Sequence, residues 1–418
     1  MSRISKPGKS LGSELEAKLS DLPQPAATHV RTLPPTRRFA FWLVLVALFA
    51  FVIEGGAWAT VQVLLKSSVQ YLFWDPDLTV VRAAWKANAN AVDDELGWPS
   101  PSATTNPPRD ASGAKYNPDF PIVNGACISA FGDSFVWGDE IPLADGWIEQ
   151  LSRLIGCRVS NFGVSNYGTD QAYIRFRRLI NNDAPVALLG IFPDDIVRNV
   201  NQYRGFMGAA PEPFWVKGRF LVDRFGRLEW IERPNLDADN WVELHRKPAL
   251  FLPREYLLPD THDGPVTVHF PYTLTLARIA IAPRIWSRLS GRTPWSEFYN
   301  VDHPSGAVPL TVAIANAFVR EAQQRSKRAF IVMLPGAGSF REVGSLARPD
   351  YAPLVTSMAA QGIDVFDPVT ALTVALNGRS YCELYVEPVA CKGHFGVAGS
   401  ALVAKVVAEE LRRRHLIN

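Results

Sequence analysis

The chain has 418 residues, of which 47% are hydrophobic, and its formal net charge is +2. This length accommodates one large domain or two ordinary ones, and the hydrophobic fraction is that of a globular protein. The near-neutral charge excludes the strongly basic surface that is typical of nucleic-acid-binding proteins, so no nucleic-acid partner is expected.

The N-terminal region has the pattern of a membrane anchor. Residues 1–38 are polar, dotted with proline and basic, and they are predicted to form a disordered tail. Residues 39–53 are continuously apolar, and weaker apolar sequence continues beyond Glu54 to residue 65. Because about 20 apolar residues cross a bilayer, residues 39–65 are predicted to form one transmembrane helix. The basic tail places the N-terminus in the cytoplasm and the rest of the chain outside it.

Two alternatives to an uncleaved anchor fit the sequence less well. Ala57-Trp58-Ala59 offers the small-x-small pattern of a signal-peptide cleavage site, but the tail before the apolar run is long for such a peptide. A buried helix of a soluble protein does not account for the flanking pair Arg37-Arg38 or for the length of the run.

The four cysteines then face an oxidising compartment, in which disulfides form. Cys382 and Cys391 are close enough in sequence to close a short loop. Cys127 and Cys157 each lie at the start of a predicted strand, and their sulfurs meet if these strands are parallel neighbours. Four buried free thiols are the alternative, because connectivity cannot be read from sequence.

The remaining sequence divides into a connector and a folded domain. Residues 66–122 include proline-rich runs and are predicted to be a connector outside the membrane, and residues 123–418 are predicted to form the domain. The expected strands are 125–130, 158–162, 186–192, 329–334 and 364–366, and the expected helices are 147–155, 169–182, 311–326, 351–361 and 396–414. Strands that alternate with helices predict an α/β fold with a parallel, doubly wound sheet.

The alternation stops between about residues 200 and 310, which are rich in aromatic residues and proline. Residues 219–230 alternate around a glycine as in a β-hairpin, and the whole segment is interpreted as an insertion on the side of the strand ends. Its aromatic side chains are candidates for stacking on sugar rings, although core packing is at least as good an interpretation. The tryptophans concerned are Trp215, Trp230, Trp241 and Trp295.

No metal and no other cofactor is expected. The chain has no Cys-x-x-Cys pair and no phosphate-cradling glycine loop. The histidines of the insertion show no metal-ligand spacing, and each is interpreted as structural. They are His245, His262, His269 and His303.

Four short motifs lie where a predicted strand gives way to a loop or where the last helix begins. The carboxyl ends of parallel strands share one edge of a sheet, and open α/β folds bind their ligands at that edge. The motifs therefore predict that a serine, backbone amides, a polar side chain and a histidine converge. In chain order they are Gly132-Asp133-Ser134, Asn161-Phe162-Gly163, Gly190-Ile191-Phe192-Pro193-Asp194-Asp195 and Gly393-His394-Phe395-Gly396.

This order and spacing resemble the SGNH/GDSL hydrolase superfamily of esterases, acetylesterases and acyltransferases, in particular its membrane-anchored bacterial members. The resemblance covers about residues 123–200 and 325–415. It implies a three-layer α/β/α, flavodoxin-like fold with a central parallel sheet, and a bacterial inner-membrane protein with its main domain in the periplasm. The matching blocks are Gly132-Asp133-Ser134-Phe135, Asn161-Phe162-Gly163-Val164, Tyr167-Gly168-Thr169-Asp170-Gln171 and Phe192-Pro193-Asp194-Asp195.

The resemblance also implies roles for individual residues. Ser134 is the expected nucleophile, and His394 is the expected base that takes its proton and returns it to the leaving alcohol. The backbone amides of Ser134 and Gly163 are expected to form part of the oxyanion hole. Gly163 also has a simpler interpretation, which is that of an ordinary turn glycine.

Two positions depart from the superfamily pattern. Asp194 stands where an asparagine usually donates to the oxyanion, and a carboxyl there could donate only if it is protonated. Cys391 stands three residues before the histidine, where an aspartate usually orients the imidazole. Glu387 and Glu383 are nearby candidates for the triad acid, and a backbone carbonyl that holds the ring in a Ser-His dyad is the alternative.

The sequence therefore predicts an enzyme that cleaves or transfers a small acyl ester, in the first place acetyl, on a cell-envelope or exported carbohydrate. The chemistry proceeds through an acyl-enzyme on Ser134, and both water and a sugar hydroxyl fit as acceptor. A catalytically decayed domain that binds a glycan, or that serves as a scaffold in an envelope or export complex, is the rival hypothesis. An esterase that acts on lipid is a third.

Overall fold

A computed structural model describes residues 34–89, 92–98, 109–208, 215–290, 292–293, 295–341 and 349–417. The chain divides into two compact units, residues 1–56 and residues 57–418. Most of the predicted cytoplasmic tail, residues 1–33, lies outside the described residues. The predicted anchor is a single helix, α2 (Pro35–Leu65), which is long and apolar enough to cross a membrane.

A five-stranded parallel sheet forms the centre of the second unit. The strands that bear the site, β2 (Ile128–Phe131), β3 (Val159–Asn161) and β4 (Val186–Ile191), are buried along their whole length, because helices cover both faces of the sheet. The strand order is the flavodoxin-like one, as predicted. Across the sheet it runs β3, β2, β4, β8 (Arg328–Met333) and β9 (Val365–Phe366).

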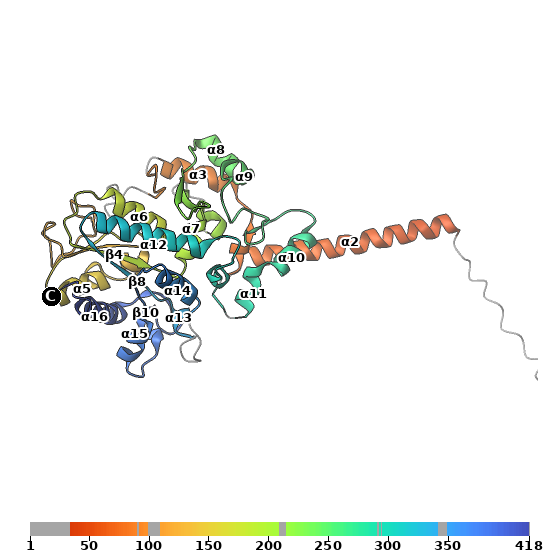
Figure 1. The fold of residues 1–418 in the computed structure, drawn as a ribbon. Helices are drawn as coiled ribbons and strands as arrows, with labels where there is room; N and C mark the ends of the chain where they lie inside the picture. Colours follow the sequence, from red (N-terminus) through yellow and green to blue (C-terminus); the bar gives the residue numbers. More distant parts are fainter. Residues whose placement is uncertain are drawn as a thin grey trace, which may run out of the picture. The chain divides into compact units, whose positions relative to one another are not determined.

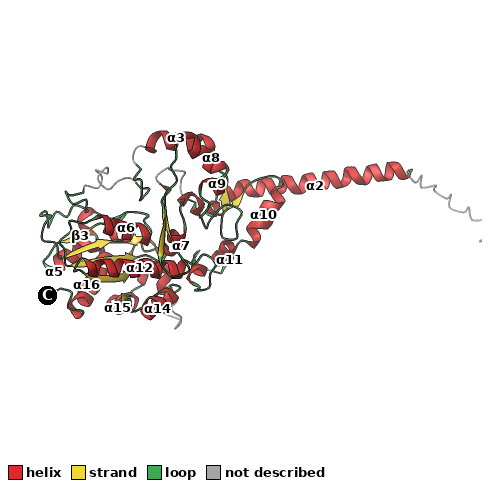
Figure 2. Ribbon diagram, turned by 45° about the horizontal axis from the view of Figure 1, so that its top comes forward, coloured by secondary structure: helices red, strands yellow, loops and turns green. Residues whose placement is uncertain are grey.

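Helices cover the sheet in two layers, which gives the expected α/β/α sandwich (Figures 1 and 2). On one face, α5 (Trp147–Ile155) packs against α16 (Val397–Arg413), and α15 (Val369–Leu376) packs on α16. The other face carries α6 (Thr169–Arg178), α7 (Asp195–Val200), α12 (Ala307–Gln324) and α14 (Ala352–Ala360).

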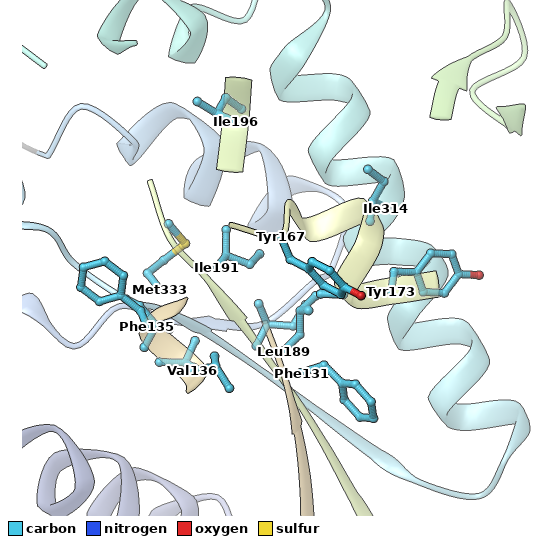
Figure 3. Close-up of a cluster of buried hydrophobic side chains, with 14 of the residues drawn as sticks. Phe131, Phe135, Val136, Tyr167, Tyr173, Leu189, Ile191, Ile196, Ile314 and Met333 are labelled. Atoms are coloured by element: carbon cyan, nitrogen blue, oxygen red, sulfur yellow. The ribbon is translucent and has the colours of Figure 1, made fainter. Parts of the chain in front are cut away.

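Large apolar side chains fill the space between the sheet and its helices. Figure 3 shows the strand residues Phe131, Leu189 and Ile191 in this core, and each of them is at most 1% exposed. Full burial of one such side chain stabilises the fold by roughly 1.5–3 kcal/mol. Two disulfides add covalent links, Cys127–Cys157 at the starts of the neighbouring strands β2 and β3 and Cys382–Cys391 near the C-terminus.

The interpretation of residues 66–122 as a connector is corrected by the structure. β1 (Phe73–Trp74) pairs with β7 (Val266–Thr267), and α3 (Leu78–Asn88) packs against α8 (Ala238–Arg246). Trp98 is 3% exposed and belongs to the main core. The described part of this segment is therefore folded together with the insertion, because its apolar side chains find partners there.

The insertion and the segments around the site contribute shorter elements. The predicted hairpin is present, although its antiparallel strands are only four residues each. The elements are α4 (Ser134–Trp137), β5 (Arg219–Val222), β6 (Leu228–Ile231), α9 (Pro248–Phe251), α10 (Tyr272–Ile281), α11 (Pro283–Leu289), α13 (Ala337–Arg341), β10 (Tyr385–Glu387) and β11 (Lys392–Phe395).

Candidate active site

Ser134 is the first residue of α4, three residues after β2 ends. Asp133 caps this short helix, since its Oδ1 accepts a hydrogen bond of 2.9 Å from the amide of Phe135. Gly132 makes the sharp turn sterically feasible, because a Cβ there would lie 2.4 Å from Val136 Cγ2. The turn holds Ser134 rigidly at the carboxyl edge of the sheet with 5% of its surface exposed.

Gly163 follows the neighbouring strand β3 and packs directly on the segment that carries the serine. A Cβ at this position would lie 2.5 Å from the backbone nitrogen of Trp137 and 3.0 Å from the carbonyl oxygen of Asp133. The amide of Gly163, which was expected in the oxyanion hole, donates to Asn161 Oδ1 at 3.0 Å. The Gly163 amide can donate to an oxyanion only if it shares its hydrogen with Asn161 Oδ1 or gives up that hydrogen bond.

Asn161 links the two segments. Its Nδ2 donates to the carbonyl of Val136 at 2.9 Å and to Glu149 Oε1 at 3.1 Å. The side chain is 1% exposed, so these bonds are shielded from water. Asn161 thereby fixes the end of α4 and the turn at Gly163 relative to each other.

His394 lies on β11, which contacts α4. Its ring packs 4.8 Å from the ring of Phe135, the residue that follows Ser134. Phe135 is itself stacked on Phe192 at 4.1 Å and lies edge-on to Phe395 at 5.1 Å. Figure 3 shows Phe135 and Val136 of α4 next to the strand residues of the core. This aromatic cluster brings the histidine to the segment that carries the serine.

The carboxylate that orients His394 belongs to Glu140. Its Oε2 accepts one hydrogen bond of 2.7 Å from the ring Nδ1 and another of 2.9 Å from the backbone amide of His394. These bonds lower the pKa of Glu140 below the usual glutamate value. Because an ionised carboxylate only accepts, the neutral imidazole carries its proton on Nδ1 and offers Nε2 as a base.

The expected acids lie elsewhere. Glu387 pairs with Lys392 at 3.2 Å and Glu383 with Arg379 at 3.3 Å, so neither candidate orients His394. Cys391, which stands at the usual position of the acid, is disulfide-bonded to Cys382. The sequence did carry one signal for Glu140, which is an acidic residue in the turn immediately after the serine helix.

A buried ion cluster supports the serine turn from below. Arg198 Nη1 donates to Asp133 Oδ2 at 2.9 Å and to Asp195 Oδ1 at 3.1 Å. The two carboxylates are at most 1% exposed and Arg198 is 12% exposed. Burial and the neighbouring Asp133 raise the pKa of Asp195 well above its usual value. Arg198 was not singled out from the sequence, because nothing in an isolated arginine indicates what it pairs with.

Two further carboxyl groups near the site have perturbed protonation. Loss of solvent, opposed by Arg198, raises the pKa of Asp194 above that of an ordinary aspartate. Burial likewise raises the pKa of Asp139, which accepts a hydrogen bond of 2.8 Å from Ser165 Oγ.

The structure places four of the insertion's candidate residues in packing or hydrogen-bonding roles, whereas His262 and His269 are exposed. Trp241 is fully buried and Trp295 is 7% exposed, so neither presents a face to a sugar. His245 is buried between Trp241 and Tyr203, and His303 bonds with Ser305 Oγ at 2.8 Å. In the part of the chain that the structure describes, no three His, Cys, Asp or Glu residues are arranged to hold a metal ion.

No model of a known protein family matches the sequence, and no curated protein is similar to it. Among solved structures, the chain is similar to a protein assigned to the lipolytic G-D-S-L family from Desulfitobacterium hafniense, with 12% identity and a TM-score of 0.33 over 68% of this chain and 97% of that chain. A member of the same family from Veillonella parvula gives 13% identity and a TM-score of 0.34 over 68% of this chain and 98% of that chain.

A mutant of an acetyl-xylooligosaccharide esterase from Geobacillus Stearmophilus is also similar, with 12% identity and a TM-score of 0.35 over 69% of this chain and 96% of that chain. At these identities and TM-scores the likeness decides nothing about the site, and the roles of the residues rest on its geometry.

Proposed function

We propose that the protein is a serine-dependent ester hydrolase or O-acyltransferase with Ser134 as nucleophile, His394 as base and Glu140 as the acid that orients the base. The observation that carries this proposal is the pair of hydrogen bonds from His394 to one oxygen of Glu140. They fix the ring and its tautomer beside the helix that bears the serine. A carboxylate at Nδ1 is the arrangement that orients the histidine base in Ser-His-acid triads.

The proposed reaction has two halves. His394 Nε2 accepts the proton of Ser134 Oγ as this oxygen attacks the ester carbonyl, and the imidazolium then protonates the leaving alcohol. Water or an acceptor hydroxyl repeats the sequence on the acyl-enzyme and releases Ser134. The Ser134 amide, the Gly163 amide and a protonated Asp194 are the proposed donors to the oxyanion.

For the substrate we propose a small acyl ester, in the first place acetyl, on a cell-envelope or exported carbohydrate. The support is the resemblance of the sequence motifs to esterases and acyltransferases of the SGNH/GDSL superfamily. The burial of Trp241 and Trp295 removes two of the aromatic side chains that had suggested sugar binding. Trp215 and Trp230 are only partly buried, so they remain candidates for stacking on a sugar ring.

For the location we propose a single-pass protein of a bacterial inner membrane, with residues 39–65 as anchor, the N-terminus in the cytoplasm and the domain in the periplasm. The apolar helix α2 supports the anchor. The two disulfides support a compartment that is oxidising, and the basic tail supports the orientation.

A non-catalytic glycan-binding or scaffold domain is the second candidate, and two observations favour it. The Gly163 amide is engaged by Asn161, and the position of the usual acid is a disulfide cysteine. A domain that has lost catalysis can tolerate both changes.

The deciding experiment measures turnover of p-nitrophenyl acetate and labelling by a fluorophosphonate, with the full chain in detergent. Ser134→Ala should abolish both signals. Ser305→Ala is the matched control, because Ser305 also touches a histidine, His303, at 2.8 Å. Absence of turnover and of labelling in the folded wild-type protein would exclude the enzyme and favour the binding domain.

A further inference from the structure

The end of α2 is part of a small apolar core that is separate from the main one. Val61 on this helix packs with Val266 on β7 and Ile279 on α10, and all three are at most 6% exposed. Ile285 on α11 packs against the same cluster. The last turns of α2 are thus fixed to α10 and α11 within the second unit (Figures 1 and 2).

The exposed side chains that the structure describes on α10 and α11 are apolar as well. On α10 the exposed side is formed by Leu274, Ala277, Ala280 and Ile281, and Ile281 is 77% exposed. A helix on the surface of a soluble domain carries charged or polar residues on its outer side. The apolar surface extends to both sides of α10, over Phe270, Trp286 and Leu289, which are 73%, 59% and 68% exposed.

Trp286 on α11 is suited to a membrane surface. Its indole Nε1 donates to the carbonyl of Ala280 at 2.8 Å, so the ring has no unsatisfied donor. Tryptophan is enriched where a membrane meets water. Arg278 on α10, whose side chain is 38% exposed, pairs with Asp260 at 3.0 Å.

The position of this surface follows from the length of the anchor. α2 has 31 residues, which corresponds to about 46 Å, whereas the hydrocarbon core of a bilayer is about 30 Å thick. If the span begins at the start of the apolar run, the turns that contact α10 emerge at the headgroup level. Lys66 follows the helix directly and is exposed, as expected of a residue at that boundary.

We propose that α10 and α11 form a second membrane contact, in which Phe270, Leu274, Ile281, Trp286 and Leu289 enter the interfacial layer of the bilayer that α2 crosses. The occupant of this surface is lipid, because α2, which packs on the opposite, buried side of α10, is itself the proposed anchor. The inference rests on the proposed anchor but is independent of the proposed chemistry. It would hold the domain in a fixed orientation on the membrane rather than on a flexible tether.

The test uses the full chain in vesicles of phosphatidylethanolamine with phosphatidylglycerol as the minor component. All four native cysteines are in disulfides, so a single introduced cysteine can carry an environment-sensitive dye. Leu274→Cys and Leu289→Cys probe the surface. Ile180→Cys, at an 81% exposed apolar residue that follows α6, is the matched control.

We expect a blue-shifted emission and quenching by nitroxide-labelled lipid at positions 274 and 289, and quenching by aqueous iodide at position 180. Iodide quenching at all three positions, in protein that floats with the vesicles, would refute the second contact and leave the anchor intact. Shielding of 274 and 289 from both quenchers would mean that another protein surface covers the face, and would also refute it. Protein that does not float after carbonate washing would overturn the anchor together with this inference. Ester turnover, measured separately, reports on the proposed function alone.

Discussion

Glu140→Gln is the substitution that bears most directly on the proposed mechanism, since it keeps the shape of the side chain and removes its charge. Glu140 Oε2 lies 2.7 Å from His394 Nδ1. When His394 takes the serine proton, the imidazolium is stabilised by this adjacent negative charge. A neutral amide supplies only a hydrogen bond, and in its other orientation its NH₂ group favours the wrong ring tautomer.

The size of the effect follows from the distance and the exposure of the pair. Two unit charges about 4 Å apart attract each other by ~1 kcal/mol in water and by ~4 kcal/mol at an effective dielectric constant of ~20. The side chains of Glu140 and His394 are 48% and 23% exposed, so solvent screening places the pair in the lower half of this range. We therefore expect kcat/KM to fall by roughly 10- to 100-fold, mainly through kcat.

The assay is hydrolysis of p-nitrophenyl acetate by the full chain in detergent, with Glu387→Gln and Glu383→Gln as matched controls. Both control residues pair with other cations, so their variants should retain activity. The pKa of Glu140 is lowered below its usual value of 4.5. The contribution of the ionised carboxylate to folding stability is therefore complete above about pH 4.5 and is lost as the pH falls through the lowered pKa. Wild-type kcat in Glu140→Gln, or an equal loss in Glu387→Gln, would refute the assignment.

Three further predictions concern the framework of the site and of the insertion. In Gly163→Ala the new Cβ would lie 2.5 Å from the backbone nitrogen of the last residue of α4. The unfolding free energy should therefore fall by about 1–3 kcal/mol, and the activity should fall with it. An unchanged melting temperature would contradict the close packing. Arg198→Met removes the ion-pair partner of the buried carboxylates of Asp133 and Asp195. The unfolding free energy measured in urea should fall by about 3–5 kcal/mol, and a smaller loss would mean that water reaches the two carboxylates. Burial lowers the pKa of His245 to about 4. The unfolded chain therefore binds a proton near pH 6.5 that the folded chain excludes. The unfolding free energy should drop by roughly 3 kcal/mol as the pH falls to about 4, and this drop should be absent in His245→Gln.

The sheet was predictable from the sequence because its central strands β2 and β4 are short, buried, mainly apolar runs. β4 was predicted over 186–192 and spans Val186–Ile191, and α5 was predicted with its observed bounds. The ends of longer helices were less predictable. α12 begins at Ala307 rather than at 311, because Gly306 adopts a left-handed conformation that starts the helix earlier.

The partners of the motif residues were not predictable in the same way. Ser134 and His394 stand in recognisable motifs, but Glu140 meets His394 across 254 residues of sequence. Only the packing of β11 against α4 creates that contact. The connector was misjudged for a related reason. The apolar face of α3 is covered by α8, which lies far from it in the sequence, so the sequence around α3 did not show that it belongs to a core.

The proposed acid of this site, Glu140, lies on a different segment of the chain than the histidine it contacts. Ser134 and Glu140 lie on one continuous segment that begins at the cap Asp133, whereas in the superfamily pattern the acid lies close to the histidine in sequence. Here the histidine stands on a separate hairpin, β10–β11, beside the disulfide Cys382–Cys391. Gly393, at a φ of +89°, leaves room for the Glu140 carboxylate, because a Cβ there would lie 3.1 Å from its Oε2. The proposed nucleophile and the proposed acid therefore lie on one segment, and the proposed site also requires the packing of β11 against α4.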